Sequence, residues 1–155
     1  MKTIRVFCLT LIFLDCLALL GCWNLPKDFA SMSLAEQLKA YEKRMQMGGA
    51  RDRIAEVQIS SHGYQAALAM VPYVRGEKTG IPLISAINII WDVQARGCAL
   101  QGSSPEAALR DFVAKNSSRD DAEALVARLA LKAISKNSPS ATQTEKIPAD
   151  LCEQR

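Results

Sequence analysis

A single histidine and five cysteines are the residues of this 155-residue chain whose types most readily suggest chemistry. A cysteine and a histidine can form a nucleophile pair, because the imidazole takes the proton from the thiol. His62 and Cys98 are the candidates for such a pair. No third group that would orient the imidazole is evident, so we expect His62 to pack or cap at a helix junction instead.

Two further patterns resemble sites but lack required residues. Residues 76–80 read GEKTG, and Glu77 stands where a phosphate-binding loop needs glycine before the lysine, so we expect a turn. Asp120, Asp121 and Glu123 cluster where a helix is expected to begin, and the helix dipole and capping account for them. The sequence therefore predicts no catalytic residues, no cofactor and a protein that is not an enzyme.

The first 21 residues have the organisation of an export signal, with a basic start, an apolar run and a small residue before Cys22. A membrane-spanning helix is the competing interpretation. It needs about 20 consecutive apolar residues, and this run is shorter and contains Asp15. The segment is therefore predicted to be a signal peptide.

Residues 19–22, Leu-Leu-Gly-Cys, resemble the lipobox of bacterial lipoproteins. The resemblance implies that residues 1–21 are removed and that Cys22 becomes the lipid-carrying N-terminus, which holds the protein at a membrane. Trp23, where an aspartate would favour the inner membrane, implies the outer membrane, facing the periplasm. The alternative is that Cys22 remains a free or paired thiol after ordinary secretion.

Cys8, Cys16 and Cys22 belong to the signal or its edge, which leaves Cys98 and Cys152 in the mature domain. An oxidising compartment favours a disulfide between them, and closing a loop of about 55 residues contributes on the order of 4 kcal/mol. The alternative is a buried Cys98 and a free Cys152. One histidine and two paired cysteines cannot form a closed tetrahedral metal site, so no metal is expected.

The charge balance argues against nucleic acid as a partner. The formal net charge is +3, becomes +2 without residues 1–21, and is not concentrated in a Lys/Arg cluster. Aromatic residues make up 6% of the chain, whereas alanine and leucine are frequent, which favours helices over strands.

Residues 22–32 are predicted to be a tether, residues 33–137 a helical domain, and residues 138–155 an irregular tail pinned by Cys152. Ser33 and Glu36 form a capping-box pattern at the start of the first helix, which should end at residues 48–49, both glycine. Residues 51–60 and 62–75 are expected to form two helices or one bent helix, with Pro72 ending or kinking the second part near Val71.

Residues 82–97 are apolar on several faces and should form the buried central helix, with Pro82 as its first residue. A strand over INIIW competes locally. Ser104 is expected to cap the next helix and Asp120 or Ser118 the last one, which should end near Asn137. The apolar positions expected in the core are Ile54, Val57, Tyr64, Leu68 and Val71 in the second region, and Ala122, Leu125, Val126, Leu129 and Ala133 in the last helix.

The predicted fold class is all-α, a small bundle of five or six short antiparallel helices with one disulfide. HEAT-like stacking of helix pairs and an orthogonal bundle both fit the helix lengths. The expected function is that of a membrane-anchored bacterial envelope lipoprotein, a non-catalytic module that binds another envelope protein. An immunity-type inhibitor of a periplasmic toxin is one form of this function, and a small cell-wall or ester hydrolase is the alternative from another class.

Overall fold

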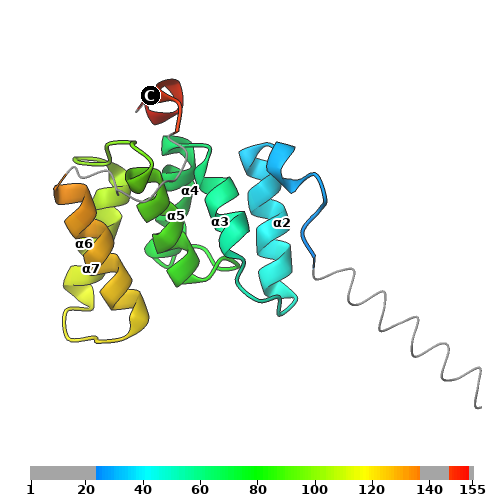
Figure 1. The fold of residues 1–155 in the computed structure, drawn as a ribbon. Coiled ribbons are helices and arrows are strands. Elements are labelled where there is room, and N and C mark those ends of the chain that lie inside the picture. Colours follow the sequence, from blue (N-terminus) through cyan, green and yellow to red (C-terminus); the bar gives the residue numbers. More distant parts are fainter. Residues whose placement is uncertain (1–23, 137–146, 154–155) are drawn as a thin grey trace, which may run out of the picture.

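The computed structural model describes residues 24–136 and 147–153, which form an all-helical domain with no strand among them (Figure 1). The elements are the 3-10 turn η1 (Phe29–Ser31), the helices α2 (Leu34–Gln46), α3 (Arg53–Ser60), α4 (Tyr64–Val74), α5 (Leu83–Ala95), α6 (Ser104–Lys115) and α7 (Ala122–Ser135), and the 3-10 turn η2 (Ala149–Cys152). None of the helices in these two ranges is both long enough and apolar enough to cross a bilayer.

The helices form two rows in which consecutive helices alternate. Helix α5 packs on α3, α4 and α7, while α6 packs on α4 and α7. The rows are therefore α3–α5–α7 and α4–α6, with α2 beside α3 at the opposite end of the domain from α7 (Figure 1). This arrangement is a stack of helix pairs, α4 with α5 and α6 with α7, which is one of the two arrangements left open by the helix lengths.

Helix α5 is the centre of the core, as its apolar residues on several faces predicted. Ile87, Ile89 and Ile90 are fully buried, and no residue of α5 is exposed. A helix that contacts neighbours on three sides can place such residues all round its axis. The competing strand over INIIW is not formed.

Local signals set most of the helix boundaries. The capping box of α2 is formed: Ser33 Oγ accepts a hydrogen bond from Glu36 N, and the Glu36 carboxylate accepts from Ser33 N at 2.9 Å. Three predicted caps are displaced by a residue. Helix α6 is capped by Ser103, α5 begins at Leu83 after Pro82, and α7 is capped by Asp121.

Residues 51–75 form two helices, and the glycine between them is the reason. Gly63 has φ +65°, a conformation that only glycine adopts readily, so the helical frame cannot continue through it. Pro72 lies inside α4, which continues to Val74, so of the two effects predicted for Pro72, a kink or an end near Val71, the end is wrong.

The predicted apolar stripe of this region is wrong at two positions. Ile54 and Leu68 are exposed, by 72% and 36%, whereas Ala55, Ile59 and Met70 are fully buried. The break at Gly63 gives α3 and α4 separate orientations, so a stripe drawn through both helices does not face one core.

The predicted tether is also partly wrong, because the chain joins the fold before residue 33. Phe29 in η1 is buried, and Leu25 and Met32 pack against the core. Gln37 Nε2 donates a hydrogen bond to the Phe29 carbonyl at 2.8 Å, which fixes η1 on α2. The folded domain therefore includes residues 25–32.

Candidate functional site

The predicted lipidation residue, Cys22, lies outside the described residues, as do the signal segment and Trp23. The structure can therefore place only the remaining candidate residues.

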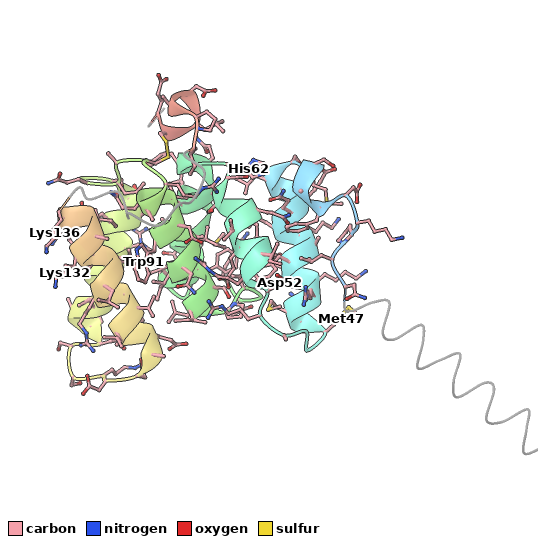
Figure 2. The ribbon with its side chains drawn as sticks, in the orientation of Figure 1. Met47, Asp52, His62, Trp91, Lys132 and Lys136 are labelled. Atoms are coloured by element: carbon pink, nitrogen blue, oxygen red, sulfur yellow. A yellow bond between two sulfur atoms is a disulfide. The ribbon has the colours of Figure 1, made fainter. Side chains whose placement is uncertain are left out.

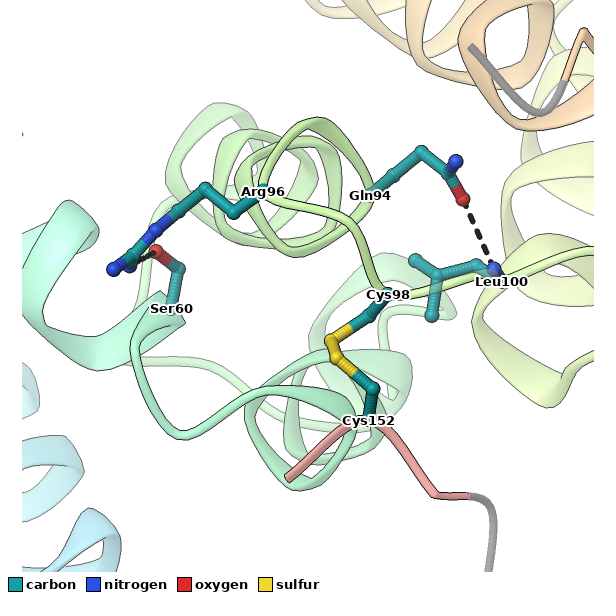
Figure 3. Close-up of a disulfide and its surroundings, with 6 residues drawn as sticks. All are labelled: Ser60, Gln94, Arg96, Cys98, Leu100 and Cys152. Carbon is teal, nitrogen blue, oxygen red and sulfur yellow. Dashed lines mark hydrogen bonds between the residues drawn. A yellow bond between two sulfur atoms is a disulfide. The ribbon is translucent and has the colours of Figure 1, made fainter. Parts of the chain in front are cut away.

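The predicted disulfide is present. Cys98, just after α5, is bonded to Cys152 in η2, with their Cα atoms 4.9 Å apart (Figure 3). A second contact holds the C-terminal segment beside the end of α5: Ile147, which is buried, donates its N–H to the Arg96 carbonyl at 3.2 Å. A sulfur held in this bond has no thiolate to attack a substrate, so the Cys98–His62 nucleophile pair is not formed in this state.

His62 lies in the turn between α3 and α4 (Figure 2). Its half-buried imidazole has no hydrogen-bond partner among the described residues, and burial lowers its pKa, which favours the neutral ring near pH 7. The ring lines an open, mostly apolar groove of about 470 Å³ with Leu34, Leu38 and Leu151. This is the packed residue at a helix junction that the sequence predicted.

Residues 76–80 form a turn, as predicted, and Lys78 Nζ lies 5.5 Å from the centroid of the Tyr73 ring. The acidic cluster at the start of α7 serves capping and local ion pairs. Asp121 accepts from Ala124 N and pairs with Arg119, and these two interactions hold the Asp121 pKa below its usual value.

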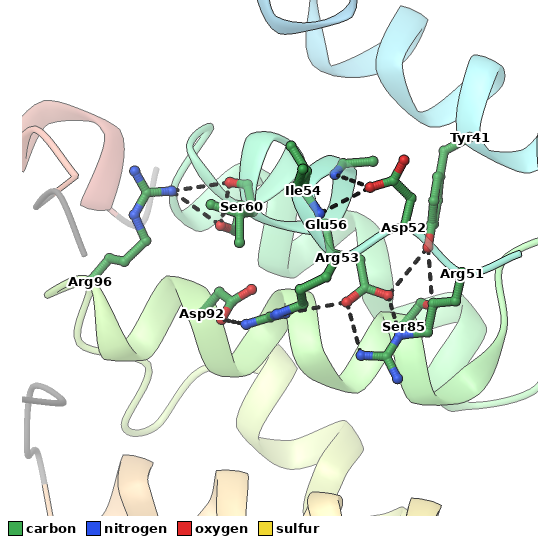
Figure 4. Close-up of polar contacts among 12 residues, drawn as sticks. Tyr41, Arg51, Asp52, Arg53, Ile54, Glu56, Ser60, Ser85, Asp92 and Arg96 are labelled. Atoms are coloured by element: carbon green, nitrogen blue, oxygen red, sulfur yellow. Dashed lines mark hydrogen bonds and ion pairs between the residues drawn. The ribbon is translucent and has the colours of Figure 1, made fainter. Parts of the chain in front are cut away.

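A buried ionic cluster around Glu56 was not predicted from the sequence (Figure 4). The Glu56 carboxylate is fully buried and accepts from Arg51 Nε at 2.7 Å, Arg53 Nη1 at 3.2 Å and the Tyr41 hydroxyl at 3.2 Å. Both carboxylate oxygens therefore accept hydrogen bonds from donors of this chain. These contacts hold α2 and α3 together, which is a structural role.

The same cluster reaches α5 through two contacts. The Tyr41 and Ser85 hydroxyls lie 3.2 Å apart, and Arg53 Nη2 donates to Asp92 Oδ1 at 2.5 Å. Burial raises the Asp92 pKa, although Arg53 acts in the opposite direction. The Arg-x-x-Glu spacing of residues 53 and 56 was the signal that could have indicated a helical ion pair.

Helix α7 exposes to solvent the side that was predicted from the sequence to face the core. Its buried residues are Ala124, Ala127, Ala130 and Ile134, whereas Leu125 and Leu129 are exposed by 53% and 41%. Alanines let a helix approach its neighbours closely, and α7 has to fit against both α5 and α6. The predicted stripe of α7 is therefore wrong at Ala122, which is exposed, and at its two leucines.

We call Leu125, Leu129, Lys132 and Lys136 the α7 outer face. Their spacings of four, three and four residues place them along one side of the helix, and all four are exposed. Figure 2 shows both lysines on the outer side of the domain, at the end farthest from α2. Two large apolar side chains in line with two cations form a surface that can bind another macromolecule.

Comparison of the chain with family models, curated proteins and solved structures gives no match. Within residues 24–136 and 147–153, no group of three or more histidine, cysteine or acidic side chains is placed to hold a metal ion.

Proposed function

We propose that this protein is a lipid-anchored component of the bacterial cell envelope whose helical domain binds another protein chain and catalyses no reaction. The lipobox resemblance of residues 19–22 supports the anchor, through Cys22. Trp23, which stands where an aspartate would favour the inner membrane, supports the periplasmic face of the outer membrane. The observation that carries the binding function is the α7 outer face.

The position of this face fits a tethered binding module. The described chain begins at Asn24 beside α2, and α7 lies at the other end of the stack of helices (Figure 1). A membrane anchor attached before Asn24 would therefore leave α7 accessible to a partner. An inhibitor of a periplasmic toxin would use such a face in the same way.

The anchor is tested by the intact mass of the protein extracted from membranes. We expect a chain that begins at Cys22, is heavier by its acyl groups, and gains about two mass units when the Cys98–Cys152 disulfide is reduced. An unmodified chain that begins at Met1 would overturn the anchor.

The binding face is tested by photocrosslinking in intact cells, with a photoreactive residue placed at Leu125 or Leu129. Ile54 is the matched control, because it is an apolar residue with greater exposure on another helix. Crosslinks to protein should form from the two α7 positions and not from Ile54. Equal crosslinking from all three positions, or none from α7, would contradict the proposed role of this face.

A further inference from the structure

We propose that the α7 outer face binds the same face of a second copy of this protein, with the two α7 helices antiparallel. This inference rests on the proposed binding function and names the partner of that face.

The apolar part of the face is complementary to itself. Leu125 and Leu129 are one turn apart, so an antiparallel pair centred between them places Leu125 of each copy opposite Leu129 of the other. A two-fold axis generates this contact with one surface patch on both copies, which is the commonest symmetry of soluble oligomers. Each leucine then buries apolar surface that is open to water in the single chain.

The charges select the antiparallel direction. Asp120 and Asp121 lie at the amino end of α7, and Lys132 and Lys136 lie toward its carboxyl end. In an antiparallel pair the lysines of each copy approach the aspartates of the other, and the helix dipoles oppose each other favourably. A parallel pair would place lysine against lysine.

The same charges favour a second copy over a lipid surface. An anionic membrane would attract Lys132 and Lys136 but repel Asp120, which is fully exposed and whose described contact is a 3.4 Å approach of Arg128. In the self-paired arrangement Lys132 and Lys136 of each copy instead approach the amino end of the other α7, where the acidic residues Asp120, Asp121 and Glu123 outnumber Arg119 and Arg128.

The size of the face predicts weak pairing that depends on concentration. Helix α7 has 14 residues and is about 21 Å long. The surface that two leucines per copy can bury is smaller than the area of about 800 Å² per partner that a standard interface buries. Confinement of both copies to one membrane surface would raise their effective concentration and favour the pair.

The test uses the full chain carrying a photoreactive residue at Leu129 and either of two C-terminal epitope tags. Both forms are expressed in one cell, crosslinked in the intact membrane and then captured from detergent extracts through one tag. An acidic variant carries Lys132→Glu and Lys136→Glu, and a basic variant carries Asp120→Lys and Ala122→Lys. All four positions are exposed, so thermal unfolding should be unchanged in both variants.

Wild type should capture itself, and each variant should capture itself at least about fivefold less, because like charges then face each other at both ends. The acidic variant mixed with the basic variant should recover capture to the wild-type level. A mixture no better than either variant alone would overturn the antiparallel pair.

Photocrosslinking from Leu125 separates this inference from the proposed function. A crosslinked product of twice the chain mass supports self-pairing. A crosslink to a different protein overturns self-pairing and leaves the binding function standing, whereas a crosslink to lipid or no crosslink overturns both.

Discussion

Breaking the Cys98–Cys152 disulfide should lower the free energy of unfolding by about 4 kcal/mol at most. The two cysteines are 54 positions apart, and in the chain-entropy model closing a loop of that size removes about 14 cal/mol/K from the unfolded state. Cys152→Ser is the cleaner perturbation, because Cys98 is fully buried and would keep its thiol. The loss should shift the thermal midpoint by roughly 10–20 °C.

The assay is urea unfolding of the full chain in detergent, followed by the helical circular dichroism signal. Cys98→Ala, Cys152→Ser and the double variant should share one midpoint, apart from the small cavity that alanine leaves at the buried position. Wild type measured with reductant should join them. The dependence on urea should also steepen without the disulfide, because the unfolded chain exposes more surface once it is no longer crosslinked.

Two results would refute this reasoning. Additive losses from the two single variants would mean that the cysteines act separately and are not bonded to each other. A midpoint that does not move on reduction would mean that loop closure contributes nothing, and that contacts such as the buried Ile147 hold the C-terminal segment in place without it.

Three further substitutions test other parts of the structure. Gly63→Ala should lower the free energy of unfolding, measured in urea, by at least about 2 kcal/mol, because the new Cβ would lie 2.2 Å from the Leu151 carbonyl oxygen in η2. Gly76→Ala is the control, because Gly76 has a similar φ but open space around it. It should lower the free energy of unfolding by only about 1 kcal/mol, from backbone strain. Asp92→Asn should remove one contribution to the pH dependence of the free energy of unfolding. Burial raises the folded-state pKa of Asp92 above 3.8, so the stability of wild type relative to Asp92→Asn, measured at several pH values, should fall as the pH rises from 3.8 through that pKa. Leu129→Gln should leave the thermal midpoint nearly unchanged, whereas Ala127→Leu should lower stability by about 1–3 kcal/mol, and the reverse order would mean that α7 is turned the other way.

The features predicted correctly from the sequence depend on short spacings between residue types or on the composition of a segment. The capping box of Ser33 and Glu36 formed because a serine and a glutamate at that spacing satisfy each other's backbone groups. The disulfide followed from a count, since Cys98 and Cys152 are the two cysteines left once Cys8, Cys16 and Cys22 are assigned to the predicted signal and its edge. The central position of α5 followed from an excess of apolar residues that a helix at the surface could not cover.

The cluster around Glu56 could not be predicted in the same way. Its donors come from α2 and from both sides of the start of α3, and its extension to α5 joins Arg53 to a residue 39 positions away. Each of these residues is ordinary in its own segment of sequence. A fully buried glutamate becomes favourable only when the fold supplies several donors at once, and that is a property of packing.

The α7 outer face follows from the way in which α7 packs against α5 and α6. Hydropathy ranks leucine above alanine, so the sequence favours burying Leu125 and Leu129, but a helix wedged against two neighbours gains more from small residues that allow close approach. Three alanines of α7 are therefore buried, and Leu125 and Leu129 are exposed on the same side of the helix as Lys132 and Lys136. Two exposed leucines one turn apart offer apolar surface that association with another chain could bury. Replacing both leucines with glutamine should therefore leave the stability of the folded domain nearly unchanged and should abolish the proposed binding of another chain.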